Sequence, residues 1–351
     1  MDTTIQRDAS IDIAKGIGII LVVFGHTFQI YSVTNYVYAF HMPLFFLLSG
    51  YTFNVQKHLQ DKWGFLRKNL LRLMIPYFGV AILSYILYVY TAPILSLPEI
   101  TANNAAFGIL SGNGINLPFN DVLWFLPAFF FAGLIFLGLT SMFNDMKLCI
   151  GMMLVSISGI IIGSYTQLPF GLDIAMTTQF FIYCGHLFRN TDWLENRKKS
   201  KTTGILIASA ATLTVLVLGT LNGRVDLMTR VYGDPAMFFL AGLSGSVLVL
   251  MTSLFFSTYF GKILQITGRA SMYVFMSHVP IAYGLAYIAA LLWGFWIYYT
   301  FETYWYLLFI IGLCVPTIVY LLVTSISHRG NSPERHSLLQ GPIKSDFVER
   351  I

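Results

Sequence analysis

The chain alternates between apolar runs of about twenty residues and short polar segments along most of its length. At about 1.5 Å rise per residue, a helix needs roughly 20 apolar residues to cross a hydrocarbon core of about 30 Å. The pattern therefore predicts an all-α polytopic membrane bundle over residues 1–325, followed by a short polar tail over 326–351. The ten predicted membrane spans are 11–31, 35–55, 73–92, 121–140, 148–165, 172–188, 203–221, 236–256, 271–292 and 304–324.

The positions of Lys and Arg predict the orientation of these spans. With the N-terminus inside, all of the 21 Lys and Arg residues except Arg224 and Arg230 lie on the inner side. Cytoplasmic loops of membrane proteins retain basic residues, so this asymmetry predicts an even number of spans with both termini in the cytoplasm. The longest outer segment, 93–120, has no Lys or Arg, and we expect it to cover an acceptor site.

Composition supports the membrane interpretation and narrows the chemistry. Of the 351 residues, 56% are hydrophobic and 11% are charged, with a mean hydropathy of +0.69. The net charge of +5 then reflects membrane topology, and no nucleic-acid partner is expected. The three cysteines are an odd number and have no CxxC spacing, so neither a disulfide framework nor a metal site is predicted.

The first span, "DIAKGIGIILVVFGHTF", carries three ionisable residues, Asp12, Lys15 and His26. At about 100° per residue, the eleven steps from Lys15 to His26 end about 20° past three full turns, and Asp12 shares the same stripe. One interpretation is that Asp12 and Lys15 reach the inner interface while His26 makes one interhelical hydrogen bond. The other is that the stripe faces a protein-lined functional cavity, because charge inside a membrane is costly.

The second span favours the functional interpretation. It runs inward, so His41 in "YVYAFHMPLFFLLSGYTF" lies at about the same depth below the outer surface as His26. Two imidazoles at one depth can share a site and are suited to proton transfer near neutral pH. Ser49 lies near the inner end of this span, away from both histidines, and we interpret it as a packing residue.

A basic cluster precedes the third span in "FLRKNLLRLMIPYF". Ordinary inner-side topology accounts for most of these residues, but Arg72 abuts the apolar run, where a cation is costly without an anion. A phosphorylated cytosolic donor would supply that anion, so Arg72 is a predicted donor-binding residue.

These residues resemble the acyltransferase family 3 integral-membrane acyltransferases, and within them the fucose 4-O-acetylase-related group. The similarity is carried by "IDIAKGIGIILVVFGH" and "FHMPLFFLLSGY", and more weakly by "RKNLLRLMIPY", "DVLWFLPAFFF" and "GRASMYVFMSHVPI". The resemblance implies transfer of an acyl group, generally acetyl from cytoplasmic acetyl-CoA, to a sugar of a cell-surface or exported glycan. It implies that His26 is the essential catalytic residue and that Lys15 is its basic partner. Many members have Arg-x-x-Arg in the third span, where this chain has Asn69-Leu-Leu-Arg72. The resemblance therefore carries over only Arg72 as a donor-binding residue and implies Arg67 or Lys68 as the replacement for the missing charge.

Three further residues are candidates of less certain role. His278 could line the donor tunnel or be a satisfied core histidine. Asp121 and Trp124 open the fourth span at the outer surface, where Trp is either an interfacial anchor or a platform for a sugar ring. His186 is interpreted as structural.

Together these features predict a multi-pass O-acetyltransferase of the inner (plasma) membrane, with catalytic His26, Lys15, Asp12 and His41 and no metal. Its partners would be acetyl-CoA, a sugar or polysaccharide acceptor, free or lipid-linked, and the lipid bilayer. The alternatives are a glycan transporter or flippase, and a non-catalytic subunit of a polysaccharide synthesis complex.

Overall fold

The computed structural model describes residues 9–28, 30–93, 99–117, 120–198, 200–256, 259–293 and 297–330. Within these ranges the protein is all-α, and the only β-type pairing is an isolated bridge between Asp226 and Val231. The α-helices are α1 (Ala9–Thr27), α2 (Tyr31–Tyr38), α3 (His41–Thr52), α4 (Val55–Gln60), α5 (Lys62–Asn69), α6 (Ile75–Thr91), α7 (Ala102–Ser111), α8 (Phe125–Met142), α9 (Asp145–Tyr165), α10 (Leu172–Thr177), α11 (Gln179–Asn190), α12 (Trp193–Lys198), α13 (Lys201–Asn222), α14 (Pro235–Phe255), α15 (Tyr259–Arg269), α16 (Ser271–Trp293) and α17 (Ile297–Gly330). Short 3₁₀ turns cover Gly114–Asn116, Asp121–Trp124 and Pro169–Gly171, and a π-helical segment covers Leu70–Met74.

The described residues contain eight helices long and apolar enough to cross a membrane. They correspond to eight of the ten predicted spans, and the all-α polytopic prediction is confirmed. The other two predicted spans are each divided into a pair of shorter helices. The 35–55 span breaks between α2 and α3, where Phe40 leaves helical geometry, and the 172–188 span breaks between α10 and α11 at Thr178.

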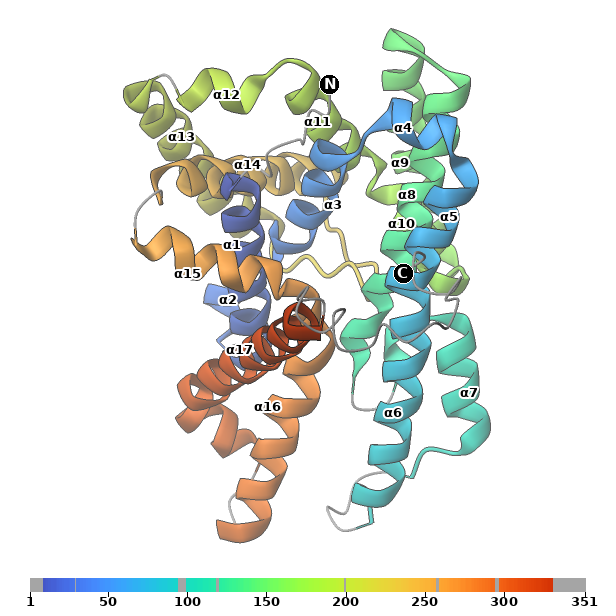
Figure 1. Ribbon diagram of the computed structural model, residues 1–351, viewed down its shortest axis with the longest axis vertical. Helices are drawn as coiled ribbons and strands as arrows, with labels where there is room; N and C mark the ends of the chain where they lie inside the picture. Colours follow the sequence, from blue (N-terminus) through green and yellow to red (C-terminus); the bar gives the residue numbers. More distant parts are fainter. Residues whose placement is uncertain are drawn as a thin grey trace, which may run out of the picture.

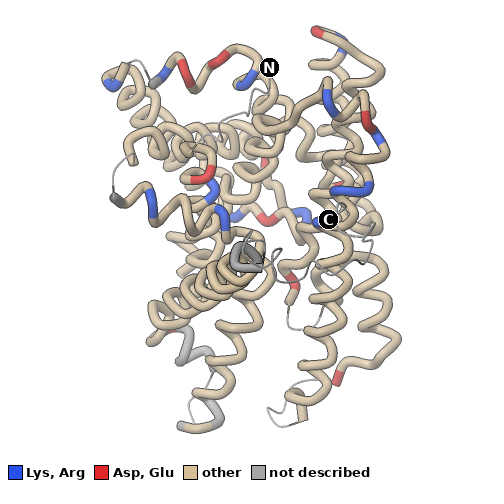
Figure 2. Tube along the Cα trace, in the orientation of Figure 1, with Lys and Arg blue, Asp and Glu red and all other residues tan. Residues whose placement is uncertain are grey.

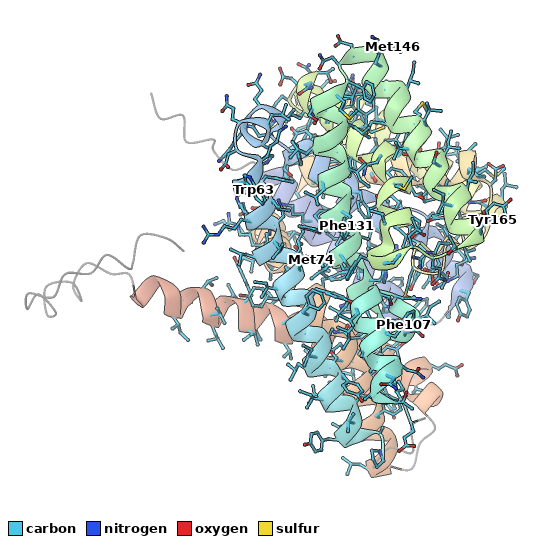
Figure 3. The ribbon with its side chains drawn as sticks, turned by 90° about the vertical axis from the view of Figure 1, so that its right-hand side faces the viewer. Trp63, Met74, Phe107, Phe131, Met146 and Tyr165 are labelled. Atoms are coloured by element: carbon cyan, nitrogen blue, oxygen red, sulfur yellow. The ribbon has the colours of Figure 1, made fainter. Side chains whose placement is uncertain are left out.

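Large apolar side chains cover much of the outside of the bundle. Among the residues labelled in Figure 3, Trp63, Phe107, Met146 and Tyr165 are exposed on one flank. Of these, Trp63 is 80% exposed and Tyr165 87% exposed. Exposed apolar surface on this scale would be unfavourable in water and is typical of helices that face lipid. The side chains therefore agree with the membrane assignment made from helix length.

The helices form distinct groups (Figure 1). In that view α8 and α9 run side by side in the upper right, α6 lies below them, and α16 and α17 occupy the lower left. Helix α15 crosses α1 at a contact made by two glycines: a side chain at Gly16 would meet the backbone of Leu264, and one at Gly268 would meet the backbone of Asp12. Only glycine permits helices to approach so closely.

Charged residues are unevenly distributed along the bundle (Figure 2). Lys and Arg gather in the upper part of that view, and the described lower ends of α6 and α16 carry none. One long helix, Lys62–Thr91, contains α5, the π-helical segment and α6, and its basic residues are all at its first half. Basic residues confined to the first half of this helix are expected if its first half lies at the cytoplasmic surface.

Candidate active site

A cavity of about 210 Å³ contains both histidines of the first two predicted spans. His26 enters from α1, His41 from the start of α3, and Asp121 with Trp124 from the turn before α8. The complete lining is Val22, Gly25, His26, Phe28, Tyr31, Thr34, Tyr38, His41, Met42, Asp121, Val122, Trp124, Arg224, Val225, Asp226, Leu227, Met228, Phe275 and Tyr283. We call it the outer cavity, and it combines two imidazoles with aromatic rings and carboxylates.

The His41 ring is oriented by its own backbone. Nδ1 of His41 lies 2.9 Å from the Val37 carbonyl oxygen. A carbonyl only accepts hydrogen bonds, so Nδ1 carries the hydrogen and Nε2 of the uncharged ring is left as an acceptor. The Tyr38 ring lies between the two histidines, with its centre 4.8 Å from that of His41 and 6.3 Å from that of His26.

The outer cavity is covered by the loop that joins α13 to α14, residues 223–234, which we call the cap loop. Five consecutive residues of this loop, 224–228, line the cavity, while no described residue of 93–120 does. The segment expected to cover the site instead supports the cap loop from behind, because a side chain at Gly114 would meet Met228 and the backbone of Asp121. The contribution of the cap loop to this cavity was not predicted from the sequence, where the longer segment 93–120 was the expected cover.

Arg224 is the cap-loop residue that reaches furthest into the aromatic lining. Its guanidinium carbon lies 3.7 Å from the centre of the Tyr38 ring and 4.9 Å from that of Tyr31. Its Nη1 donates a hydrogen bond of 3.3 Å to the hydroxyl of Thr34. The sequence does single out Arg224 as a candidate, because Arg224 and Arg230 are the only basic residues assigned to the outer side.

Asp226 brings a second carboxylate to this cavity. Its Oδ1 accepts a hydrogen bond from the Met228 N–H at 3.0 Å. Burial raises the pKa of the Asp226 carboxyl above its ordinary value, and this effect outweighs the opposing influence of the backbone N–H groups and of Arg224. The carboxylate is therefore held in an environment where a polar ligand would relieve its poor solvation.

A buried ion pair fastens the cap loop to the bundle. Arg230 Nε lies 2.7 Å from Asp173 Oδ2, and Arg230 Nη2 lies 3.1 Å from Asp173 Oδ1. The two side chains are 5% and 0% exposed. Arg230 also has a positive φ of 62°, a strained conformation for a residue with a side chain. This bidentate pair fixes the loop against α10 and makes Arg230 structural.

A second, larger cavity of about 1030 Å³ opens among the basic residues, and we call it the inner cavity. Six basic side chains line it, from Lys15, Lys57, Lys68, Arg72, Arg189 and Arg269, against two carboxylates, from Asp12 and Asp192. Such a concentration of positive charge attracts an anionic ligand. Of the predicted donor residues, Lys68 and Arg72 line the cavity, whereas Arg67 is exposed and does not.

Local structure explains how Arg72 and Asp12 are placed. Arg72 sits in the π-helical segment Leu70–Met74, a distortion that changes the direction of side chains and is frequent at functional sites. Asp12 on α1 is buried, and its Oδ2 accepts a hydrogen bond of 3.2 Å from Arg269 Nε of α15. This partner was not predicted from the sequence.

The inner cavity is also lined by four residues that were not predicted to bind the donor: Lys57, His58, Arg189 and Arg269. Burial, followed by the charges of Lys57 and Lys68, lowers the pKa of His58. His58 is therefore uncharged near neutral pH. The basic residues at the predicted inner ends of the spans indicated on which side of the membrane this cluster lies. They did not indicate that its members line one cavity.

An apolar wall separates the two cavities. Phe275 of α16 lines both of them. Its ring centre lies 5.0 Å from that of Phe125, which in turn lies 6.1 Å from that of Phe45. On α1, Ile19 lines the inner cavity and Val22, less than one turn further, lines the outer cavity. The barrier is therefore one layer of side chains thick along α1.

His278 occupies neither cavity lining among the described residues, contrary to the prediction that it could line the donor tunnel. It is completely buried one turn beyond Phe275, and its ring centre lies 5.2 Å from that of His26. The structure thus places it behind the outer cavity, beside the histidine of the first helix.

The fold and its two opposed cavities define a polytopic membrane protein with a basic pocket on one side and a histidine-containing pocket on the other. A family model described as an acyltransferase domain matches residues 8–324. The chain therefore belongs to this family, acyltransferase family 3, and is a membrane acyltransferase. No curated protein and no solved structure matches it. The narrower resemblance to the fucose 4-O-acetylase-related group stays a prediction.

Proposed function

We propose that the protein is an O-acetyltransferase of the inner (plasma) membrane that moves acetyl from cytoplasmic acetyl-CoA to a hydroxyl of a cell-surface or exported glycan. The observation that carries this proposal is the single-layer wall between a large basic cavity and a smaller cavity that contains His26. An acyltransferase that joins a polyanionic donor to an acceptor from the other side needs two such sites in contact.

The inner cavity has the properties that acetyl-CoA requires. Its phosphate groups would be held by basic side chains, with Lys68 and Arg72 the predicted contacts and Lys57 and Arg189 added by their positions in the lining. The pantetheine arm is narrow and largely uncharged. It could pass the wall at Phe275 and bring the thioester to the neighbourhood of His26.

The outer cavity has the properties of a site for one sugar unit. Aromatic side chains such as Trp124 and Tyr31 offer faces for the ring, and Asp121 and Asp226 offer acceptors for its hydroxyl groups. The volume of about 210 Å³ corresponds to about seven water molecules in the liquid, at about 30 Å³ each. A sugar ring, not an extended chain, is therefore the expected occupant.

The proposed reaction has His26 as general base. Its imidazole takes the proton of the acceptor hydroxyl, and the oxygen attacks the carbonyl carbon of the thioester. The C–O bond forms, the C–S bond breaks, and the leaving thiolate takes the proton from the imidazolium, which gives the acetyl ester and CoA. The same position also allows His26 to carry the acetyl group briefly before the hydroxyl attacks.

The test uses the purified protein in lipid nanodiscs with labelled acetyl-CoA and candidate lipid-linked glycans. His26→Ala is expected to lower acetyl transfer by at least about 100-fold, because general acid–base catalysis contributes on that scale. His186→Ala is the matched control, since His186 lines neither cavity and contacts Asn190. Full transfer by His26→Ala would contradict the proposal. Movement of glycan without consumption of acetyl-CoA would favour the transporter alternative instead.

A further inference from the structure

The His278 ring has one nitrogen occupied and one without a partner. Nδ1 lies 2.9 Å from the Val274 carbonyl oxygen and 3.0 Å from that of Phe275. Both oxygens only accept, so Nδ1 carries the hydrogen and Nε2 of the uncharged ring is an acceptor. Among the described residues, Nε2 is buried and has no hydrogen-bond partner. A buried polar atom left in this state calls for a specific explanation.

The surroundings of His278 exclude bulk water as the partner. The side chain is 0% exposed. Helix α17 closes the site from behind, because a side chain at Gly312 would lie 3.8 Å from the Cβ of His278 and 3.5 Å from Val23 of α1. The acceptor nitrogen is therefore sealed between three helices, α1, α16 and α17.

His26 is the polar ring beside it. The two ring centres are 5.2 Å apart, so the rings are neighbours, and a small rotation of the His26 side chain would bring one of its N–H groups within hydrogen-bonding distance of His278 Nε2. His41 also has an acceptor Nε2, but His41 lines the outer cavity, where a substrate hydroxyl can satisfy it. His278 has no access to that cavity among the described residues, so His26 is the donor within its reach.

We propose that His278 is a positioning residue for His26: its Nε2 accepts the N–H of His26 and thereby fixes which His26 nitrogen faces the outer cavity. The nitrogen that faces the cavity then presents its lone pair to the acceptor hydroxyl. When His26 takes the hydroxyl proton, the His278 lone pair stabilises the imidazolium through the hydrogen on the other nitrogen. This inference rests on the proposed function, in which His26 is the general base.

Two substitutions separate this role from a structural one. His278→Gln keeps an acceptor near the position of Nε2 but loses the donor at Nδ1. His278→Asn keeps a donor near the position of Nδ1, where it can reach the Val274 carbonyl, but loses the acceptor that faces His26. A positioning role requires the glutamine variant to be the more active, whereas a purely structural role requires the asparagine variant to be the more active.

The experiment measures kcat and the acetyl-CoA KM of the full-length protein in nanodiscs, with His186→Gln as the control. We expect His278→Asn to lower kcat by about 100-fold with the acetyl-CoA KM unchanged, and His278→Gln to lose less than about tenfold. Wild-type kcat in His278→Asn, or a larger loss in His278→Gln than in His278→Asn, would overturn the inference.

A second readout does not depend on acetyl transfer. The rate at which diethyl pyrocarbonate modifies His26, followed by mass spectrometry, should fall several-fold in His278→Asn and remain near the wild-type rate in His278→Gln. Equal rates in all variants would contradict the pairing. If the wild-type protein transfers no acetyl group at all, the proposed function fails, but the modification rates still decide whether His278 orients His26.

Discussion

Arg67 and Arg72 lie five residues apart at the start of one long helix, yet they have different surroundings. Both side chains are exposed, but Arg72 lines the inner cavity from the π-helical segment, whereas Arg67 lines neither cavity among the described residues. A cation outside the cavity contributes little to ligand affinity, while one that faces a bound phosphate can make charge-assisted hydrogen bonds. The chain therefore supplies its own matched pair for testing the donor site.

We expect Arg72→Ala to raise the acetyl-CoA KM by about tenfold, which corresponds to about 1.4 kcal/mol for one lost charge-assisted contact. Arg67→Ala should change it by less than twofold. Steady-state kinetics at fixed acceptor concentration measure both values. An unchanged KM in Arg72→Ala, or equal increases in the two variants, would show that the donor phosphates bind elsewhere.

The Asp226 carboxyl should make binding of the sugar acceptor in the outer cavity depend on pH. Because burial raises its pKa, this carboxyl gains a proton at a higher pH than an exposed Asp, whose pKa is about 3.9. As the pH falls from 7 towards that raised value, the charge that accepts a sugar hydroxyl is lost. The acceptor KM should therefore rise on acidification. The acetyl-CoA KM should not follow the protonation of Asp226.

The Asp226→Asn variant tests this expectation, because it keeps an oxygen for the Met228 N–H but cannot titrate. Its acceptor KM should exceed that of the wild type at pH 7 and rise less than that of the wild type as the pH falls to 5. If the variant shows the wild-type rise on acidification, another group is responsible.

At the scale of the elements, two interruptions shape the site. The break between α2 and α3 occurs just before His41 and places His41 at a helix start with Tyr38 beside it. The break between α10 and α11 leaves the short helix that carries Asp173, the partner of Arg230. In each case an irregular segment within the bundle lines or supports a cavity, the setting in which such segments are tolerated at membrane depth.

The Asp173–Arg230 pair should contribute to both stability and acceptor binding. Removal of one partner leaves an uncompensated buried charge, so Arg230→Met is expected to cost about 3–5 kcal/mol. It should also raise the acceptor KM, because residues 224–228 of the cap loop line the outer cavity. The acetyl-CoA KM should not change.

The double variant Asp173→Leu/Arg230→Met is the control, since it removes both charges and should recover more than half of the lost stability. Thermal unfolding in detergent and separate KM measurements for the two substrates follow these effects. Wild-type stability in Arg230→Met, or no recovery in the double variant, would contradict the assignment of the pair as a clamp.

At the scale of the whole molecule, orientation decides the direction of the reaction. The inner cavity is assigned to the cytoplasm because its lining holds six Lys and Arg side chains, and the outer cavity to the opposite side because its lining holds one. The acetyl group would then cross the membrane through the wall at Phe275, and the acceptor would be modified on the outer side.

Single cysteines test this orientation. Asn103 on α7 and Lys62 at the start of α5 are both exposed and belong to opposite predicted sides. Asn103→Cys should react with a membrane-impermeant maleimide in intact spheroplasts, and Lys62→Cys only in inside-out vesicles. Asn103 is preferable to Asn113, whose amide donates a hydrogen bond to Gln167. The reverse pattern of labelling would invert the proposed topology.

Features that depend on residues near one another along the chain could be predicted without the structure. Runs of apolar residues predicted the helices because helix length and bilayer thickness are matched. The spacing of Asp12, Lys15 and His26 predicted one polar stripe, and these three residues do line the cavities, Asp12 and Lys15 the inner and His26 the outer. The spacing of residues along a helix fixes the directions in which their side chains point, so this stripe could be predicted without knowledge of the tertiary structure.

Helix packing fixes which distant residues lie beside those of the stripe, and the sequence pattern did not predict these contacts. Asp12 pairs with Arg269, 257 residues away, and His26 lies beside His278. The cap loop lines the outer cavity, whereas no described residue of 93–120 does, and the Asp173–Arg230 pair holds the cap loop in place. Such contacts depend on how helices pack against one another, and helix periodicity specifies which face is polar but not which helix that face will meet.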